Sequence, residues 1–290
     1  LFIQGLLDRL KEGGGGVVVA EGYVREFERR GYLSAGVFVP VVVLEHPDMV
    51  KRMHEEFVHA GSDVVLAFTY YGHRDKLRHI GREDELEKLN RTALKMAREV
   101  ADKTGTLMAG LPAVITMTAY IPDVTTDDVP FPEACRKLEE AGAAVVGLNC
   151  GRGPATMLPL IKEIRKECKG PVAAVPVPYR CTDESRTFQS LKDPVTGERL
   201  YPTNISCFEC NRSDIRKFAE EAKNIGVKYI GVCCGNNGGL TREVAQVYGR
   251  KPEACKYSPD ISLSCVFGES SKEEKYSRSS KIRDFMIKGN

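Results

Sequence analysis

The most constraining feature of this chain is a set of seven short runs of apolar, mostly β-branched residues, each nearly continuous rather than alternating with polar positions. Strands that are buried on both faces, as in a parallel sheet, have this pattern, whereas half-exposed strands alternate. The runs cover residues 16–20, 63–69, 106–110, 112–118, 143–149, 171–177 and 227–233. We therefore expect an α/β protein built on a parallel sheet.

Amphipathic stretches with helical spacing lie between these runs and predict the connecting helices. They cover residues 83–103, 132–141, 155–168, 213–225 and 241–248. Alternating strands and helices form βαβ units with right-handed crossovers. The four glycines at 13–16 precede a strand instead of following one, so the chain lacks the glycine fingerprint of a dinucleotide fold. A (β/α)8 TIM barrel is therefore favoured over an open doubly wound sheet.

Seven strands are one short of a closed barrel, and the place of the missing strand can be predicted. Only Leu111 separates the run 106–110 from the run 112–118, whereas parallel neighbours need a crossover of about a dozen residues or more. Either the two runs form one continuous strand, or a strand–helix segment is missing between Gly110 and Leu111. We favour the missing segment.

The strand and helix pattern ends near Arg250. This predicts a barrel domain over residues 1–250 and a C-terminal arm over residues 251–290. Residues 258–290 are rich in Ser, Lys and Glu. Such a segment is either a loose tail or an arm that docks in an oligomer, and we expect a homo-oligomer.

Charge and hydropathy exclude several classes of protein. Lys and Arg number 42 against 40 Asp and Glu, and this net charge of +2 does not indicate a nucleic-acid partner. No apolar run approaches the roughly 20 residues of a membrane span, and the N-terminus lacks the order of a signal peptide. Ten cysteines in a chain of this length, without an export signal, indicate reduced thiols and a cytoplasmic protein.

Three cysteines follow the ends of predicted strands. Cys150 ends the run 143–149, and the adjacent pair Cys233 and Cys234 ends the run 227–233. Parallel strands of a barrel end on one face, so these thiols are expected on the same face. Three thiolates with one open position form a catalytic zinc site. The alternative is three buried thiols that happen to end strands, and spacing alone leaves the two readings about even.

Other strand ends and one Cys-x-x-Cys pair also carry candidate residues. Glu21 and Gly22 follow the first run, where a carboxylate faces the barrel mouth and a glycine lets the backbone approach a ligand. The alternative for Glu21 is an acid that favours a helix N-terminus. Aromatic residues 70–71 follow the second run, where their rings either hold a cation or pack against the core and rim of the barrel. Cys207 and Cys210 lie between strands. They could be half of a zinc knuckle or a redox pair, but an incidental pair of cysteines is the favoured interpretation.

Together these features resemble the homocysteine S-methyltransferases, and most closely the betaine–homocysteine S-methyltransferase branch. The matching segments are 17–22, 27–32, 45–47, 61–62, 68–71, Asn149-Cys150 and Gly231-Val232-Cys233-Cys234-Gly235. The combination of Asn-Cys with Gly-x-Cys-Cys-Gly is highly specific for the family. It raises the zinc interpretation of the three thiols far above that of buried thiols.

The resemblance implies transfer of a methyl group from an onium donor, betaine-like or sulfonium, to zinc-bound homocysteine, giving methionine. It implies Cys150, Cys233 and Cys234 as zinc ligands and Glu21 as the acid that serves the homocysteine amino group or sulfur. The implied substrate-binding residues are Gly22, Phe38, Tyr71 and Asn149. Tyr71 matches the donor-side tyrosine of the family, and Phe38 lies where the betaine enzymes carry tryptophan.

The chain departs from the family in two places. A further strand, which ends in a substrate-contacting glutamate, falls at the Gly110–Leu111 junction. The arm also lacks a clear match to the dimerisation and donor-binding segment of the betaine enzymes. The alternative function is therefore a non-catalytic relative with a structural or scaffolding role.

Overall fold

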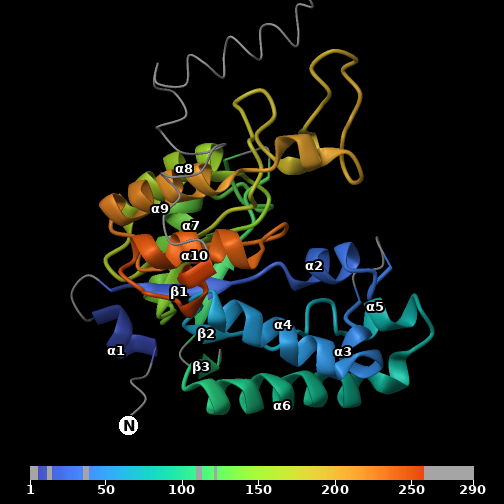
Figure 1. The fold of residues 1–290 in the computed structure, drawn as a ribbon. Helices are drawn as coiled ribbons and strands as arrows, with labels where there is room; N and C mark the ends of the chain where they lie inside the picture. Colours follow the sequence, from blue (N-terminus) through green and yellow to red (C-terminus); the bar gives the residue numbers. More distant parts are fainter. Residues whose placement is uncertain (1–5, 12–14, 35–38, 109–112, 121–122, 258–290) are drawn as a thin grey trace, which may run out of the picture.

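Seven parallel strands form one sheet in the described part of the computed structural model, which covers residues 6–11, 15–34, 39–108, 113–120 and 123–257 (Figure 1). The strands are β1 (Val17–Ala20), β2 (Val64–Val65), β3 (Leu107–Met108), β4 (Val114–Met117), β5 (Val145–Asn149), β6 (Val172–Val175) and β7 (Tyr229–Val232). Their order in the sheet is β3-β2-β1-β7-β6-β5-β4. Each strand lies within one of the seven predicted runs, so the α/β fold with a parallel sheet is confirmed.

Helices connect the consecutive strands other than β3 and β4. The helices are α1 (Leu6–Lys11), α2 (Tyr23–Arg29), α3 (Val42–Glu45), α4 (Pro47–His59), α5 (Arg74–Arg78), α6 (Leu86–Thr104), α7 (Phe131–Glu140), α8 (Pro154–Glu167), α9 (Arg212–Ile225) and α10 (Gly238–Val247). The helices α6 to α10 match the five predicted helical stretches, whereas α1 to α5 were not predicted. Short 3-10 turns lie at Glu83–Glu85, Phe188–Ser190, Ile205–Phe208 and Glu253–Tyr257. The Asn211 side chain caps α9 by accepting from the Asp214 backbone N–H at 2.9 Å, which satisfies a donor that the helix leaves unpaired.

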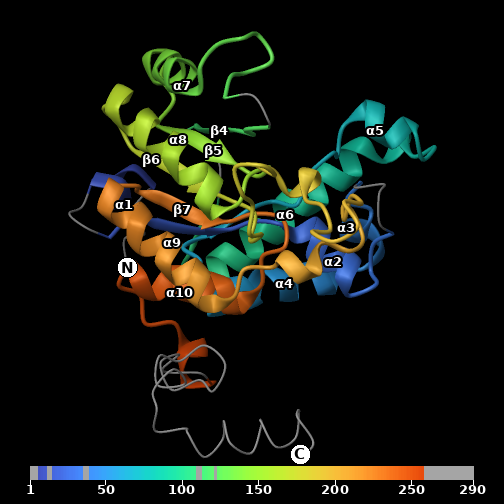
Figure 2. The ribbon, with the colours of Figure 1, turned by 90° about the horizontal axis from the view of Figure 1, so that it is seen from above.

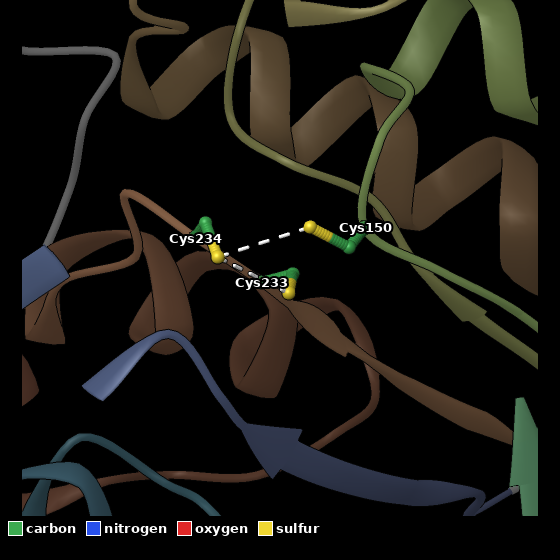
Figure 3. Close-up of side chains that lie close together, drawn as sticks. All are labelled: Cys150, Cys233 and Cys234. Atoms are coloured by element: carbon green, nitrogen blue, oxygen red, sulfur yellow. Dashed lines mark hydrogen bonds between the residues drawn. The ribbon is translucent and has the colours of Figure 1, made fainter. Parts of the chain in front are cut away.

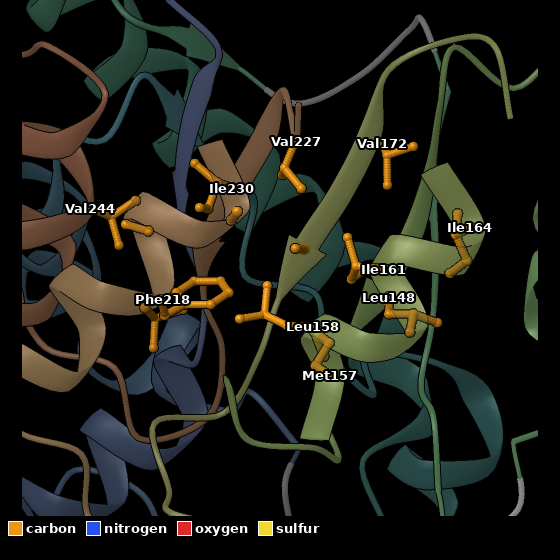
Figure 4. Packing of buried hydrophobic residues seen from close by; sticks show 14 of the residues in the cluster. Leu148, Met157, Leu158, Ile161, Ile164, Val172, Phe218, Val227, Ile230 and Val244 are labelled. Carbon is orange, nitrogen blue, oxygen red and sulfur yellow. The ribbon is translucent and has the colours of Figure 1, made fainter. Parts of the chain in front are cut away.

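Both faces of the sheet are buried at its central strands, and the edge strand β4 is half-buried. This burial explains why the strands read as continuous apolar runs. One face packs against α7 to α10 through alternate strand residues such as Val18, Leu148 and Ile230 (Figure 4). The neighbouring residues, among them Val19 and Tyr229, point to the other face. There they meet apolar side chains of the long connection between β6 and α9.

The sheet has two edge strands, β3 and β4, and no hydrogen-bonded ladder joins them within the described residues. Figure 2 shows β4 and α7 on the opposite side of the molecule from α4. Every other consecutive pair of strands is separated by at least one helix, whereas only residues 109–113 separate β3 from β4. The eighth strand and the closed barrel therefore stay predictions.

The Gly110–Leu111 junction lies outside the described residues. The predicted arm, 251–290, is described only as far as Tyr257, and the domain boundary at residue 250 stays a prediction. Within the described residues, no helix is both long and apolar enough to cross a bilayer.

Candidate functional site

The carboxyl ends of β1, β5 and β7 bring together residues that are far apart in sequence. β1 pairs with β7, and β6 lies between β7 and β5. Because all strands are parallel, the residues that follow them lie at one edge of the sheet. Glu21 follows β1, Cys150 follows β5, and Cys233 follows β7.

The sulfur atoms of Cys150, Cys233 and Cys234 converge at this edge, as predicted (Figure 3). Cys234 Sγ lies 3.8 Å from Cys150 Sγ and 3.9 Å from Cys233 Sγ, and all three sulfurs lie within 4.8 Å of one another. A tetrahedral zinc ion with Zn–S bonds of about 2.3 Å would hold its sulfur ligands about 3.8 Å apart. The spacing of these thiols therefore fits three ligands of one tetrahedral metal with a fourth position open.

The backbone around Cys150 holds its thiol in this arrangement. Cys150 has a positive φ of 62°, and its backbone N–H donates to the Val175 carbonyl at 2.9 Å. Hydrogen bonds from the thiols of Cys233 and Cys234 hold the pKa of Cys150 well below its usual value. The thiolate is the form that binds a metal. The hydrogen bonds to Cys150 raise the pKa values of Cys233 and Cys234, so Cys150 is the thiol of the three that ionises first.

Glu21 and Asn149 are linked to the thiols by hydrogen bonds. Asn149 Nδ2 donates to the Glu21 carboxylate, and the Cys233 thiol donates to Asn149 Oδ1 at 3.4 Å. Burial raises the pKa of Glu21 to about 7; the hydrogen bond from Asn149 lowers it, and Cys150 raises it further. The structure thus places the predicted acid and the predicted amide together at the thiol cluster.

Gly22 has a structural reason to be glycine. Its φ is +84°, and a Cβ atom there would lie 2.5 Å from the carbonyl oxygen of Cys233. The turn after β1 therefore packs directly on the turn that carries the two adjacent thiols. Any side chain at this position would displace one of the two turns.

Of the two aromatic residues predicted to bind substrate, Tyr71 and Phe38, the structure describes only Tyr71. Tyr71 stacks on Tyr70 with ring centroids 4.2 Å apart, and Lys76 Nζ lies 4.6 Å from the Tyr71 centroid. Phe38 lies outside the described residues. The roles of Phe38 and Tyr71 in donor binding stay predictions.

Cys207 and Cys210 do not join the thiol cluster. Both are free thiols, Cys207 exposed and Cys210 buried. Within the described residues, Cys150, Cys233 and Cys234 form the one group of three or more potential ligands.

Two residues of the site were missed by the sequence analysis. Asn236 is fully buried and bonds Thr241 through both its amide atoms, while its Nδ2 also donates to the Glu21 carbonyl at 3.4 Å. Arg152 is buried and donates to the Tyr120 carbonyl and to Asp123. Asn236 directly follows the Cys-Cys-Gly motif, and Arg152 lies two residues after Cys150. This closeness to the cysteine motifs was the only signal for them in the sequence.

The model of a protein family described as homocysteine S-methyltransferase matches residues 22–116 and again residues 105–248. The chain belongs to the homocysteine S-methyltransferase family. This family assignment confirms the resemblance that the cysteine motifs indicate. It also supports methyl transfer to homocysteine as the chemistry of this family member.

Curated relatives agree with the assignment, and a solved structure shares the fold. The S-methylmethionine–homocysteine S-methyltransferase BHMT2 of Pongo abelii is 30% identical over 298 residues, covering 80% of this chain and 78% of the relative. The betaine–homocysteine S-methyltransferase 1 of Mus musculus is 28% identical over 300 residues, covering 80% and 72%. The oxidized form of the homocysteine methyltransferase MmuM from Escherichia coli matches the fold with a TM-score of 0.59 and 13% identity. It covers 84% of this chain and 99% of MmuM.

The alignment to the Pongo relative also contains positions that this chain does not match. It is 298 positions long but covers 80% of this chain, about 232 residues, so about 66 of its positions have no counterpart here. The two matches of the family model overlap at residues 105–116. These residues include the whole of β3 and most of β4.

Proposed function

We propose that this chain binds one zinc ion through Cys150, Cys233 and Cys234 and transfers a methyl group from an onium donor to homocysteine, giving methionine. The observation that carries the proposal is the spacing of the three sulfurs at the strand ends. Cys234 Sγ lies 3.8 Å from Cys150 Sγ and 3.9 Å from Cys233 Sγ. Those distances suit a tetrahedral metal with one position left for a substrate thiol.

When bound, zinc would supply a Lewis acid that lowers the pKa of the homocysteine thiol, so that the substrate is held as thiolate at neutral pH. The thiolate then attacks the methyl carbon of the donor. An S–C bond forms, and the bond from that carbon to the donor's nitrogen or sulfur breaks. Its electron pair neutralises the leaving group, so the reaction needs no oxidant or reductant. The chain's contribution is to align the two substrates and to exclude water.

The donor is a small onium compound, either a quaternary ammonium or a sulfonium. Support comes from the relatives, whose names include both betaine and S-methylmethionine enzymes. The test is to load the purified chain with zinc and to measure methionine formed from homocysteine with each donor class. A zinc-loaded chain that forms no methionine with any onium donor would refute the proposal and favour the non-catalytic alternative.

Glu21 is proposed as the acid that receives the homocysteine amino group. Its carboxylate accepts a hydrogen bond from Asn149, whose side-chain oxygen accepts one from the Cys233 thiol. Among the described residues, Glu21 belongs to no group of three potential metal ligands. We expect Glu21→Ala to raise the KM for homocysteine about 10- to 100-fold, since a charge-assisted pair contributes about 1.5–3 kcal/mol. Zinc content should change little.

The control for this variant is Glu87→Ala, which removes an exposed carboxylate on α6. It should leave both zinc content and the homocysteine KM unchanged. Loss of zinc from Glu21→Ala with an unchanged homocysteine KM would reverse the assignment.

We also propose that the native molecule carries a further strand–helix segment between Gly110 and Leu111, which would complete an eight-stranded barrel. Three observations support it: β3 and β4 lie at opposite edges of the sheet, no described helix connects them, and about 66 positions of a relative are unmatched. Amplification of the transcript across the Gly110 and Leu111 codons should give a product longer by roughly 180 nucleotides, the size of about two βαβ elements. A product of the length encoded here would contradict the proposal.

A further inference from the structure

A single buried residue, Asn236, joins two turns at the edge of the sheet where the thiols lie. Its side-chain Nδ2 donates to the Glu21 carbonyl at 3.4 Å, and its backbone N–H donates to the Cys233 carbonyl at 2.9 Å. The Asn236 side chain is fully buried. This residue therefore contacts both the turn that carries the proposed substrate acid and the turn that carries two of the thiols.

The amide of Asn236 is held in one orientation by α10. The Thr241 hydroxyl, which is also buried, accepts from Asn236 Nδ2 at 3.0 Å and donates to Asn236 Oδ1 at 3.1 Å. The Asn236 carbonyl accepts from Arg29 Nη2 of α2 at 3.4 Å. Every polar atom of Asn236 is thus bonded, and a buried polar network in this state is rigid. The amide cannot turn away from Glu21 without leaving buried groups unpaired, which is costly.

The position of Glu21 depends on this amide because the chain leaves the sheet there. The Glu21 N–H donates to the Val232 carbonyl at 3.3 Å, beyond the paired residues of β1 and β7. Gly22, with a φ of +84°, then turns the chain into α2. The bond from Asn236 holds the Glu21 carbonyl on the far side of that peptide unit. The main chain of Glu21 is therefore fixed against the thiol turn at both its N–H and its carbonyl.

The spacing of these two turns sets the length of the amino-acid thiol that fits the site. In the proposed function, homocysteine is held at two points, its amino group at Glu21 and its sulfur at the open metal position. Cysteine is shorter by one methylene group. If the spacing is rigid and suits homocysteine, cysteine cannot reach both points, whereas a flexible spacing would adapt to either thiol.

We propose that Asn236 is a positioning residue that locks the Glu21 turn to the thiol turn and thereby makes the site select homocysteine over cysteine. The inference rests on the proposed function and adds a specificity determinant to it. Thr241 belongs to the same lock because it orients the Asn236 amide. Neither side chain needs to touch the substrate.

The experiment measures the Kd of homocysteine and of cysteine by calorimetry on the zinc-loaded full chain, without a methyl donor. We expect the wild-type chain to bind homocysteine about 10-fold or more tightly than cysteine, the usual range for one methylene group. Asn236→Ala and Thr241→Val should each reduce this ratio about 5- to 10-fold, mainly by weakening homocysteine, because small misplacements of a two-point site are costly. Thr241→Ser keeps the hydroxyl and should keep the ratio.

The control is Asn211→Ala, which removes a buried-end amide of the same kind from the cap of α9. It should lower the urea concentration at the unfolding midpoint and leave the ratio unchanged. The same result for Asn236→Ala and Thr241→Val would show a purely structural role and overturn the inference. Thr241→Val decides alone if Asn236→Ala does not fold.

Two further outcomes separate the inference from the proposed function. A wild-type chain that binds both thiols equally would overturn the inference, and methionine formation by that chain would still support the proposed function. A ratio that falls in both variants of a chain that forms no methionine would keep the inference and refute methyl transfer.

Discussion

Cys150→Ser is expected to abolish zinc retention and methyl transfer together while leaving the fold in place. Serine has nearly the size of cysteine, but its hydroxyl is a far poorer zinc ligand than a thiolate. Loss of a hydrogen-bond partner of a metal ligand already costs about 10- to 100-fold in metal affinity or activity. Loss of the ligand itself should therefore cost more than about 100-fold. Zinc per chain after dialysis, methionine formation and circular dichroism together measure the three quantities.

The matched control is Cys207→Ser, which makes the same chemical change at an exposed thiol outside the cluster. It should retain zinc and activity. Near-normal methyl transfer by purified Cys150→Ser would rule out a role for this thiol in the reaction. Loss of activity with full zinc retention would separate Cys150 from metal binding and leave the site to the remaining two thiols.

The thiol cluster could be predicted from the sequence because one topological rule locates it. Continuous apolar runs identify the strands, and parallel strands end on one face, so the residues after β5 and β7 are expected on that face. That the three thiols form one metal site was implied only by the resemblance to the family. The same rule places Glu21 on that face, and the pairing of β1 with β7 in the structure brings it beside the thiols. No side-chain geometry was needed for these inferences.

Other parts of the site depend on contacts that no local pattern encodes. The covering of Tyr71 by Tyr70 and Lys76 depends on the path of the loop after β2. The bonds from Arg152 to Tyr120 join segments 32 residues apart. A residue type and its neighbours in sequence do not determine such contacts, because tertiary packing selects among many loop conformations.

Gly231→Ala is expected to destabilise the fold and to disturb the site at the same time. Gly231 lies in β7 opposite Val19 of β1, and a Cβ atom there would lie 2.1 Å from the Val19 carbonyl oxygen. Real Cβ contacts are essentially never below 3.0 Å, so the two central strands would have to move apart. Overpacking of this kind costs about 3 kcal/mol at the upper end of the usual range.

The same displacement should reach the metal ligands, because β7 leads directly into Cys233 and β1 leads into Glu21. We therefore expect Gly231→Ala to bind zinc more weakly than the wild-type chain even under conditions where it is folded. Urea unfolding gives the change in the free energy of unfolding, and a zinc titration of the folded variant gives the change in affinity. Gly15→Ala is the control, since a Cβ atom there would have no neighbour within 4 Å. If Gly231→Ala unfolds at the same urea concentration as Gly15→Ala, the close approach of β1 and β7 does not exist in the native protein. The strand pairing that places Glu21 beside the thiols would then lose its support.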